Sequence, residues 1–257
     1  MVNEKTKQDI QAKQYEFPYH YIPEPFESFK LSRHWAFAPS YIAAMKLVAE
    51  WLEPIAKKYG DNWRHIDIGC GDGALIYYLR LQLSAQEYQL EGVDLDQRAI
   101  GWARMFNPST AFHLQDVAEI ERRYHSASLI EVLEHIPPDN LDSFIAESMN
   151  ILLPGGIALI TVPSVEKTVP NKHFQHFSFS CIRSLFEPYL DDMEIYGFER
   201  RNVITRAISI ARSNTIASID SPVLNKITVW YLRQLHRSQK RCGRLLVIGT
   251  RNKKHVM

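Results

Sequence analysis

The sequence has few cysteines and no long hydrophobic run. Its three cysteines, Cys70, Cys181 and Cys242, are far apart. They form no CxxC pair, which argues against a disulfide framework or a cysteine zinc site. No stretch approaches the roughly eighteen apolar residues that span a bilayer, and the polar N-terminus lacks the apolar core of a signal peptide. We therefore expect a cytoplasmic protein without a membrane partner.

An excess of one charge is absent too. The chain has 257 residues with 30 Lys and Arg and 29 Asp and Glu, and 46% of its residues are hydrophobic. This composition is ordinary for a globular protein, and the length suits one large α/β domain. The one strongly basic stretch, residues 233–244, is typical of a solvated helix face. We therefore expect no nucleic-acid partner, although a local basic patch leaves that question open.

Short apolar runs alternate with amphipathic segments along most of the chain. Expected strands are 65–68, 89–94, 110–116, 127–132, 157–163, near 193–198 and 244–250. Expected helices are 39–60, 73–84, 96–106, 139–152, near 178–190 and near 222–240. This alternation predicts an α/β fold, with a parallel sheet covered by helices on both faces.

Two segments stand outside this alternation. Residues 1–38 are expected to form an N-terminal arm or cap, with a polar, frayed start at 1–14 and aromatic and proline residues beyond. The remainder, residues 39–257, is expected to be the main domain. It contains a possible substrate-recognition insertion at about 200–242.

Three of the eleven glycines, Gly69, Gly71 and Gly73, lie between the first expected strand and the helix after it. In an open α/β sheet, ligands bind beyond the carboxyl ends of the strands, and a glycine turn lets a ligand approach the backbone. Asp94 ends the second strand, where it could accept hydrogen bonds from ribose hydroxyls. Asp116 follows the third strand, where it could accept from an adenine amino group.

The segments HIDIGCGDGALI, LEGVDLDQRAIGWARM, FHLQDV, SLIEVLEHIPPDNL and LLPGGIALITVPS resemble successive motifs of class I S-adenosylmethionine-dependent methyltransferases. The resemblance implies a Rossmann-like, seven-stranded, mostly parallel sheet with a reversed last strand, and S-adenosyl-L-methionine as cofactor. It places Asp67, Gly69 and Gly71 beside the methionine moiety, Asp94 at the ribose, Asp116 and Val117 at the adenine, and Ile130 as the residue that closes the pocket. Leu95, next to Asp94, is also counted among the cofactor-binding residues.

Acidic residues and histidines follow the fourth and fifth strands. Glu131, Glu134 and His135 come after the fourth strand, and His173 and His176 after the fifth. Carboxylates and imidazoles together suit a divalent cation, which would lower the pKa of a bound hydroxyl. We predict Glu131, Glu134, His135 and His176 as ligands of Mg²⁺ or Mn²⁺, and His135, His173 and His176 as catalytic residues.

Glu131, Glu134 and His135 match the metal motif of ubiquinone-biosynthesis O-methyltransferases. With His176 added, the set is similar to the Glu-Glu-His-His site of small-RNA 3′-terminal 2′-O-methyltransferases. Without a metal, the histidines are candidate general bases or plain loop residues.

The predicted function is transfer of a methyl group from S-adenosylmethionine to a small hydroxylated metabolite or sugar. One alternative is a metal-dependent RNA 3′-terminal 2′-O-methyltransferase, and another is an inactive methyltransferase fold that serves as a scaffold. The sequence leaves the oligomeric state open.

Overall fold

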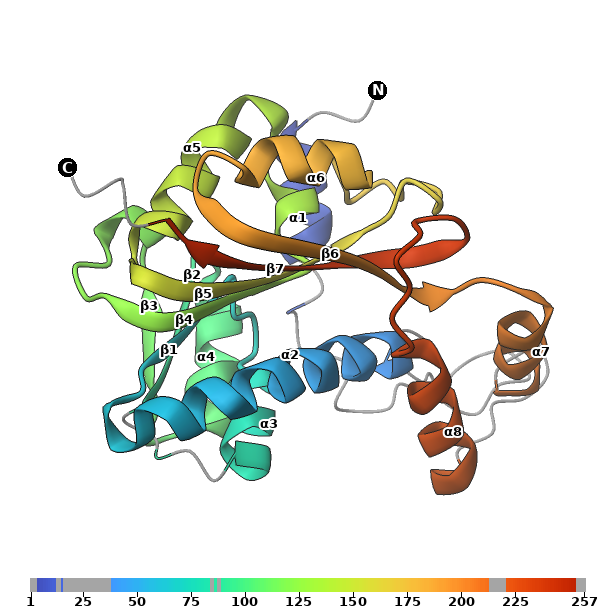
Figure 1. The fold of residues 1–257 in the computed structure, drawn as a ribbon, viewed down its shortest axis with the longest axis horizontal. Coiled ribbons are helices and arrows are strands. Elements are labelled where there is room, and N and C mark those ends of the chain that lie inside the picture. The colour runs from blue at the N-terminus through green and yellow to red at the C-terminus, as the bar shows by residue number, and fades with distance from the viewer. Residues whose placement is uncertain are drawn as a thin grey trace.

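A seven-stranded sheet lies between helices that cover both of its faces (Figure 1). The computed structural model describes residues 4–12, 15, 38–83, 86, 89–212 and 221–252. The strands are β1 (His65–Ile68), β2 (Leu90–Asp94), β3 (Ala111–Leu114), β4 (Tyr124–Ile130), β5 (Leu152–Pro163), β6 (Leu190–Arg200) and β7 (Cys242–Arg251).

The strand order is β3-β2-β1-β4-β5-β7-β6. The pairs β1–β2, β1–β4, β2–β3 and β4–β5 are parallel, whereas β7 runs antiparallel to both β5 and β6. All four residues of β1 are buried, as expected for a central strand with both faces covered. The predicted Rossmann-like sheet with a reversed last strand is confirmed.

Five helices form the two layers. They are α2 (Ala38–Tyr59), α3 (Ala74–Leu83), α4 (Gln97–Phe106), α5 (Pro138–Asn150) and α6 (Phe179–Phe186). The apolar cluster on one face includes Leu52 of α2, Leu79 of α3 and Ile100 of α4. The cluster on the other face includes Ile145 of α5 and Ile182 of α6. Each of these five helices overlaps one predicted from the sequence.

The N-terminal prediction was wrong in part. Residues 1–14 were expected to fray, but Glu4–Ala12 form helix α1. The reason is a tertiary contact, since the Lys7 ammonium donates to the backbone carbonyl of His173. The rest of the predicted aromatic arm, residues 16–37, lies outside the described part of the chain.

Elsewhere, the largest differences from the predicted boundaries are at β5 and at the last expected helix. Strand β5 begins at Leu152, before the Pro-Gly-Gly sequence expected to separate helix from strand. Gly155 adopts a φ of +78°, and the pairing register with β4 shifts at this point. The long helix expected near 222–240 is the shorter α8 (Pro222–Leu232), and a further helix, α7 (Val203–Arg212), precedes it.

Among the described residues, no helix combines the length and the apolar character needed to cross a membrane.

Candidate cofactor and acceptor site

The loop after β1 requires its glycines. Gly69, Gly71 and Gly73 have φ values of +67°, +53° and +76°, which residues with a Cβ rarely adopt. A Cβ on Gly69 would lie 2.6 Å from a methyl carbon of Val132, and one on Gly71 would lie 2.8 Å from the Tyr15 hydroxyl oxygen. Any other residue at these positions would therefore strain the backbone and displace a neighbour.

The Asp94 carboxylate is fixed beside this loop at the end of β2. One oxygen accepts from the backbone N–H of Gly71 at 2.9 Å, and the other accepts from that of Asp96 at 2.8 Å. Burial raises the pKa of Asp94, and these two bonds oppose the rise. The adjacent Leu95 side chain is exposed. The geometry therefore holds Asp94 in place and leaves Leu95 open to a ligand.

A buried chain of hydrogen bonds orients Asp67. The Ser128 hydroxyl donates to Asp67 at 2.6 Å, so it accepts from Nε2 of His65 at 3.1 Å. His65 Nδ1 then accepts from the Ser126 hydroxyl at 3.0 Å, which itself accepts from the indole N–H of Trp63. Burial lowers the pKa of His65 to about 3, so this ring is neutral as the chain requires. Burial also raises the pKa of Asp67 to about 7, which the Ser128 bond opposes.

The remaining predicted cofactor residues lie at the neighbouring strand ends. Asp116 is exposed after β3, and one carboxylate oxygen accepts from the backbone N–H of Ala118 at 3.0 Å. Val117 and Ile130 are buried. The structure thus brings Asp67, the glycine loop and Asp94 together, and puts Asp116 one strand further along the same edge.

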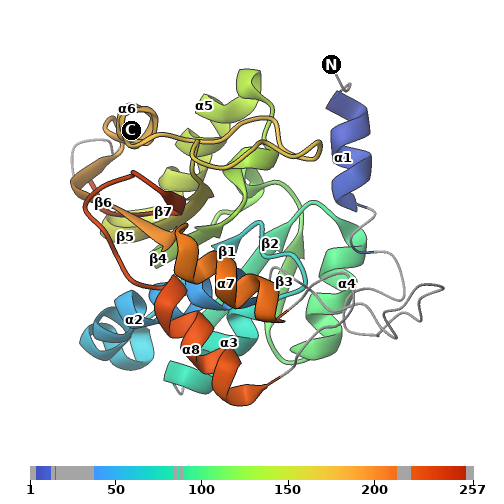
Figure 2. The same ribbon diagram turned by 90° about the vertical axis from the view of Figure 1, so that its right-hand side faces the viewer.

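Tyr15 and Lys7 connect the glycine loop to the loop after β5 that carries His173 and His176, which we call the histidine loop. The Tyr15 hydroxyl lies against the glycine loop, and the Tyr15 carbonyl accepts from the indole N–H of Trp102 at 3.3 Å. Burial raises the pKa of Tyr15, and nearby carboxylates raise it further. In α1, Lys7 bonds the carbonyl of His173 and lies over the Phe174 ring, 5.1 Å from its centre. Figure 2 shows α1 standing above α4.

Glu134, His135 and His173 converge on one point. Their potential ligand atoms all lie within 4.8 Å of one another. Glu134 and His135 come from the short helical turn Leu133–His135, and His173 comes from the loop after β5. His135 Nδ1 lies 3.2 Å from the Lys172 carbonyl, which can only accept, so the His135 lone pair is on Nε2. That nitrogen lies 4.0 Å from a Glu134 oxygen.

The neighbouring His176 sets the tautomer of His173. His176 Nδ1 donates to the Lys167 carbonyl at 3.0 Å, which leaves the His176 lone pair on Nε2. This nitrogen accepts from Nδ1 of His173 at 2.9 Å, so the His173 lone pair is on Nε2. Burial lowers the pKa of His135 to about 4 and that of His173 to about 2. Both rings are therefore neutral at pH 7.

Glu134 is the least satisfied member of the group. Its side chain is 1% exposed, and within the described chain its Oε2 atom has no hydrogen-bond partner. Burial and the nearby Glu131 raise its pKa well above the usual range. A buried carboxyl oxygen without a donor is costly. A carboxylate and two neutral imidazoles are common ligands of a divalent cation. Glu134, His135 and His173 therefore fit such an ion.

Glu131 is engaged elsewhere. Its φ of +57° is unusual for a non-glycine residue, and its carboxylate pairs with Nε of Arg244 at 2.7 Å and accepts from Thr161 at 3.2 Å. Burial is the largest single influence and favours the neutral acid, but the Arg244 guanidinium, Lys167 and the Thr161 bond together outweigh it and hold the pKa of Glu131 below its usual value. Arg244 also pairs with Glu199.

Of the four predicted cation ligands, Glu134 and His135 belong to the convergent group. His173, predicted only as catalytic, takes the third place, and His176 lies behind it. Direct roles of Glu131 and His176 as ligands stay predictions. Sequence reasoning missed Arg244, although its position at the start of an apolar strand indicated burial.

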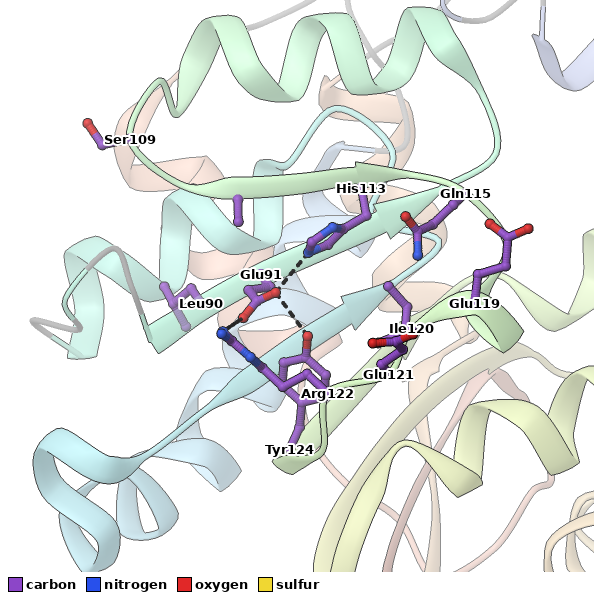
Figure 3. Close-up of a pocket in the computed structure, with 11 residues that line it drawn as sticks. Leu90, Glu91, Ser109, His113, Gln115, Glu119, Ile120, Glu121, Arg122 and Tyr124 are labelled. Carbon is purple, nitrogen blue, oxygen red and sulfur yellow. Dashed lines mark hydrogen bonds and ion pairs between the residues drawn. The ribbon is translucent and has the colours of Figure 1, made fainter.

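A cavity of about 540 Å³ lies away from these groups, along β2 and β3 (Figure 3). At its base, Glu91 accepts from Arg122 at 2.5 Å, His113 at 2.8 Å and Tyr124 at 2.9 Å. These donors satisfy the buried carboxylate. The short helical turn Val117–Glu119, in the connection between β3 and β4, contributes Glu119 to the lining of the cavity.

The seven-stranded sheet with a reversed β7, the glycine loop after β1 and the acidic residue ending β2 define a class I S-adenosylmethionine-dependent methyltransferase. A family model described as a methyltransferase domain matches residues 35–198, and the chain belongs to this family.

Similar proteins span several activities. Over 128 residues the chain is 27% identical to cyclopropane-fatty-acyl-phospholipid synthase from Escherichia coli (strain K12), a match that covers 49% of this chain and 31% of the synthase. The chain thus spans about a third of that relative's length.

Two solved structures share the fold. Magnesium protoporphyrin IX methyltransferase from Synechocystis PCC 6803, with bound S-adenosylmethionine, is 14% identical with a TM-score of 0.56, covering 97% of this chain and 98% of that one. An S-adenosylmethionine-dependent methyltransferase from Archaeoglobus fulgidus is 16% identical with a TM-score of 0.54, covering 83% of this chain and 97% of that one.

Proposed function

We propose that this methyltransferase transfers the methyl group to a hydroxyl of a small acceptor, and that Glu134, His135 and His173 hold a divalent cation beside that hydroxyl. The observation that carries the proposal is the buried, unpartnered oxygen of Glu134 beside two neutral imidazoles. An Mg²⁺ or Mn²⁺ ion would supply a lowered pKa for the acceptor hydroxyl.

Methyl transfer from a sulfonium is an in-line displacement, so the protein's task is alignment and, for a hydroxyl, removal of one proton. In this proposal Asp94 accepts from the ribose, Asp116 from the adenine, and Asp67 with the glycine loop holds the methionine end. His176 is a positioning residue, because its bond to Nδ1 of His173 keeps the His173 lone pair on Nε2.

A histidine that does not hold the cation is the alternative acceptor of the hydroxyl proton. The lone pairs on Nε2 of His135 and of His173 are open to a proton only where no cation occupies them, and the low pKa values of both rings make them weak bases, so the proposal relies on the cation. Cation binding and proton acceptance call for the same tautomers, and the carbonyls of Lys172 and Lys167 set both of them.

The first test is calorimetric titration of Mn²⁺ and Mg²⁺ into the protein with S-adenosylhomocysteine present. We expect wild type to bind one ion, and Glu134→Gln and His173→Asn to lose binding. Glu119→Gln, which changes an exposed carboxylate, is the matched control and should bind as wild type does. Absence of binding in wild type would remove the cation from the proposal.

The second test supplies labelled S-adenosylmethionine with a panel of small hydroxylated acceptors, sugars and RNA with free 3′ ends. Label on the small molecules supports the proposal. Label on RNA ends would favour the 2′-O-methyltransferase alternative instead. Cofactor binding without label on any acceptor would favour the scaffold alternative.

A further inference from the structure

Helix α8 carries apolar side chains on two opposite faces. On its inner face, Val229 is buried and packs against Ala43 of α2. On its outer face, Val223, Ile227 and Trp230 recur at helical spacing and are 68%, 50% and 57% exposed. A surface helix normally keeps large apolar side chains to the one face that packs on the core. The outer stripe therefore points to a partner.

Helix α7 adds to this surface. It contacts α8, and both helices stand at the same end of the molecule (Figures 1 and 2). Val203 and Ile204, in its first turn, are 83% and 54% exposed. Single exposed apolar residues are common on any protein. Together with Val223, Ile227 and Trp230 of α8, Val203 and Ile204 form a group on two touching helices, and such a group usually marks an interaction site.

The same segment is strongly basic. Within residues 200–242 the only acidic residue is Asp220. The basic residues are Arg200, Arg201, Arg206, Arg212, Lys226, Arg233, Arg237, Lys240 and Arg241. Arg206 of α7 and Lys226 of α8 are exposed. Arg233 pairs with Glu50 and Arg237 with Glu194, which offsets part of this charge. Because the whole chain carries a net charge of only +1, the segment is still a local concentration of positive charge.

The segment leaves and rejoins the sheet at the edge that carries the site. Arg200, the last residue of β6, pairs with Cys242, and Pro163, the last residue of β5, pairs with Arg244. The carboxyl ends of β5 and β6 therefore meet at the edge where the histidine loop begins. A surface that engages α7 and α8 would lie beside this edge.

We infer that α7 and α8 dock on the surface of a bilayer that contains anionic phospholipids. Apolar side chains with a tryptophan enter the boundary between head groups and acyl chains, while lysine and arginine attract anionic head groups. A nucleic acid would pair with the basic residues but would leave the outer apolar stripe of α8 exposed to water. A second copy of the chain would cover the stripe and bring two basic surfaces together. A lipid surface satisfies both features.

The expectation of no membrane partner was based on the absence of a membrane-spanning run. Docking on the surface of a bilayer needs no such run. It is also independent of the acceptor and of the cation, because it concerns binding alone. The helices lie on the surface, with the outer stripe of α8 and the first turn of α7 facing the lipid.

The test is co-sedimentation of the full chain with vesicles of phosphatidylcholine alone or with about 30% phosphatidylglycerol. We expect binding to the anionic vesicles that weakens at high salt. Ile227→Glu with Trp230→Glu should reduce the bound fraction about tenfold or more. Leu81→Glu with Met105→Glu, at exposed apolar positions on α3 and α4, is the matched control and should bind as wild type does.

A second variant keeps the inference testable if the glutamate substitutions prevent folding. Arg206→Gln with Lys226→Gln keeps the apolar stripe and should lose the preference for anionic vesicles. Failure of wild type to bind vesicles, or equal binding by all variants, would overturn the inference. A dimer in light scattering that Ile227→Glu with Trp230→Glu dissociates would assign the stripe to a second copy. RNA binding by wild type without vesicle binding would assign the basic segment to nucleic acid.

Discussion

Individual side chains at the site depend on burial for their properties. Asp67, Glu134, His135 and His173 all have pKa values displaced in the direction that favours the neutral form, and burial is the largest cause for each. The exception is Glu131, which Arg244 keeps ionised. One charged pair, Glu131 with Arg244, therefore lies beside Glu134, His135 and His173, the group that we propose holds a cation.

Asp94→Ala should weaken S-adenosylhomocysteine binding by about thirtyfold or more, because it removes the proposed ribose acceptor and leaves the Gly71 N–H without its partner. Calorimetry measures this affinity. Asp191→Ala, at an exposed position on β6, should bind as wild type does. Unchanged affinity in Asp94→Ala would remove this residue from the cofactor site.

Affinity for S-adenosylhomocysteine should fall as the pH drops through about 7. Burial raises the pKa of Asp67 to about 7, so the carboxylate that would hold the ligand's ammonium is ionised above this pH and protonated below it. Below the pKa the affinity should fall roughly tenfold per pH unit. Ser128→Ala removes a bond that lowers this pKa, so its midpoint should move to higher pH. A flat profile would place the ammonium elsewhere.

Arg244→Met should destabilise the protein by about 3–5 kcal/mol, because it leaves the largely buried Glu131 without its guanidinium partner and leaves Glu199 with Lys167 alone. Urea unfolding measures the loss. Arg233→Met breaks a more exposed pair with Glu50 and should cost under about 1 kcal/mol. Equal effects of the two substitutions would contradict the importance given to the buried pair.

At the scale of elements, α1 connects two parts of the site that are distant in sequence. Tyr15 contacts the glycine loop, and Lys7 contacts the histidine loop. Nothing in the polar sequence of residues 4–12 indicates this contact, because a short polar helix depends on tertiary partners for stability. The central strands were predictable for the opposite reason, since continuous apolar runs such as that of β5 are buried in the sheet.

Lys7→Ala should lower turnover about tenfold and leave the unfolding temperature unchanged, because it removes a charged donor to the histidine loop without touching the core. Steady-state kinetics and thermal unfolding separate these effects. Lys57→Ala, which breaks an exposed pair with Glu53, is the control. If Lys7→Ala turns over as fast as wild type, α1 only packs against the domain and does not support the histidine loop.

At the scale of the molecule, the sequence predicted the sheet, its reversed strand and the edge that carries the site. It did not predict which of the acidic residues and histidines converge on one point and which of them bond to other residues. From spacing alone, Glu131 was predicted as a cation ligand beside Glu134, and His176 was predicted as a ligand where His173 was not. Only the folded chain shows that Arg244 pairs with Glu131 and that His176 supports His173. Those distinctions depend on residues from β7 and distant loops, which local patterns do not specify.

S-adenosylhomocysteine should stabilise the whole molecule, because a ligand that binds only the folded state adds about 2.7 kcal/mol at a hundred times its Kd. For a chain of this size, that corresponds to a rise of roughly 5–10 °C in unfolding temperature. Differential scanning calorimetry measures the shift. An unshifted transition would contradict binding to the folded state.

The position of β7 has a consequence for synthesis. This strand is made after the other six, yet it lies inside the sheet, and among the described strands β6 pairs with it alone. Until residues 242–251 leave the ribosome, β5 and β6 therefore each expose an edge with unpaired backbone groups. During synthesis the nascent chain therefore passes through a stage in which two aggregation-prone strand edges are unpaired because β7 has not yet been made. A chaperone that shields these edges would act at that stage.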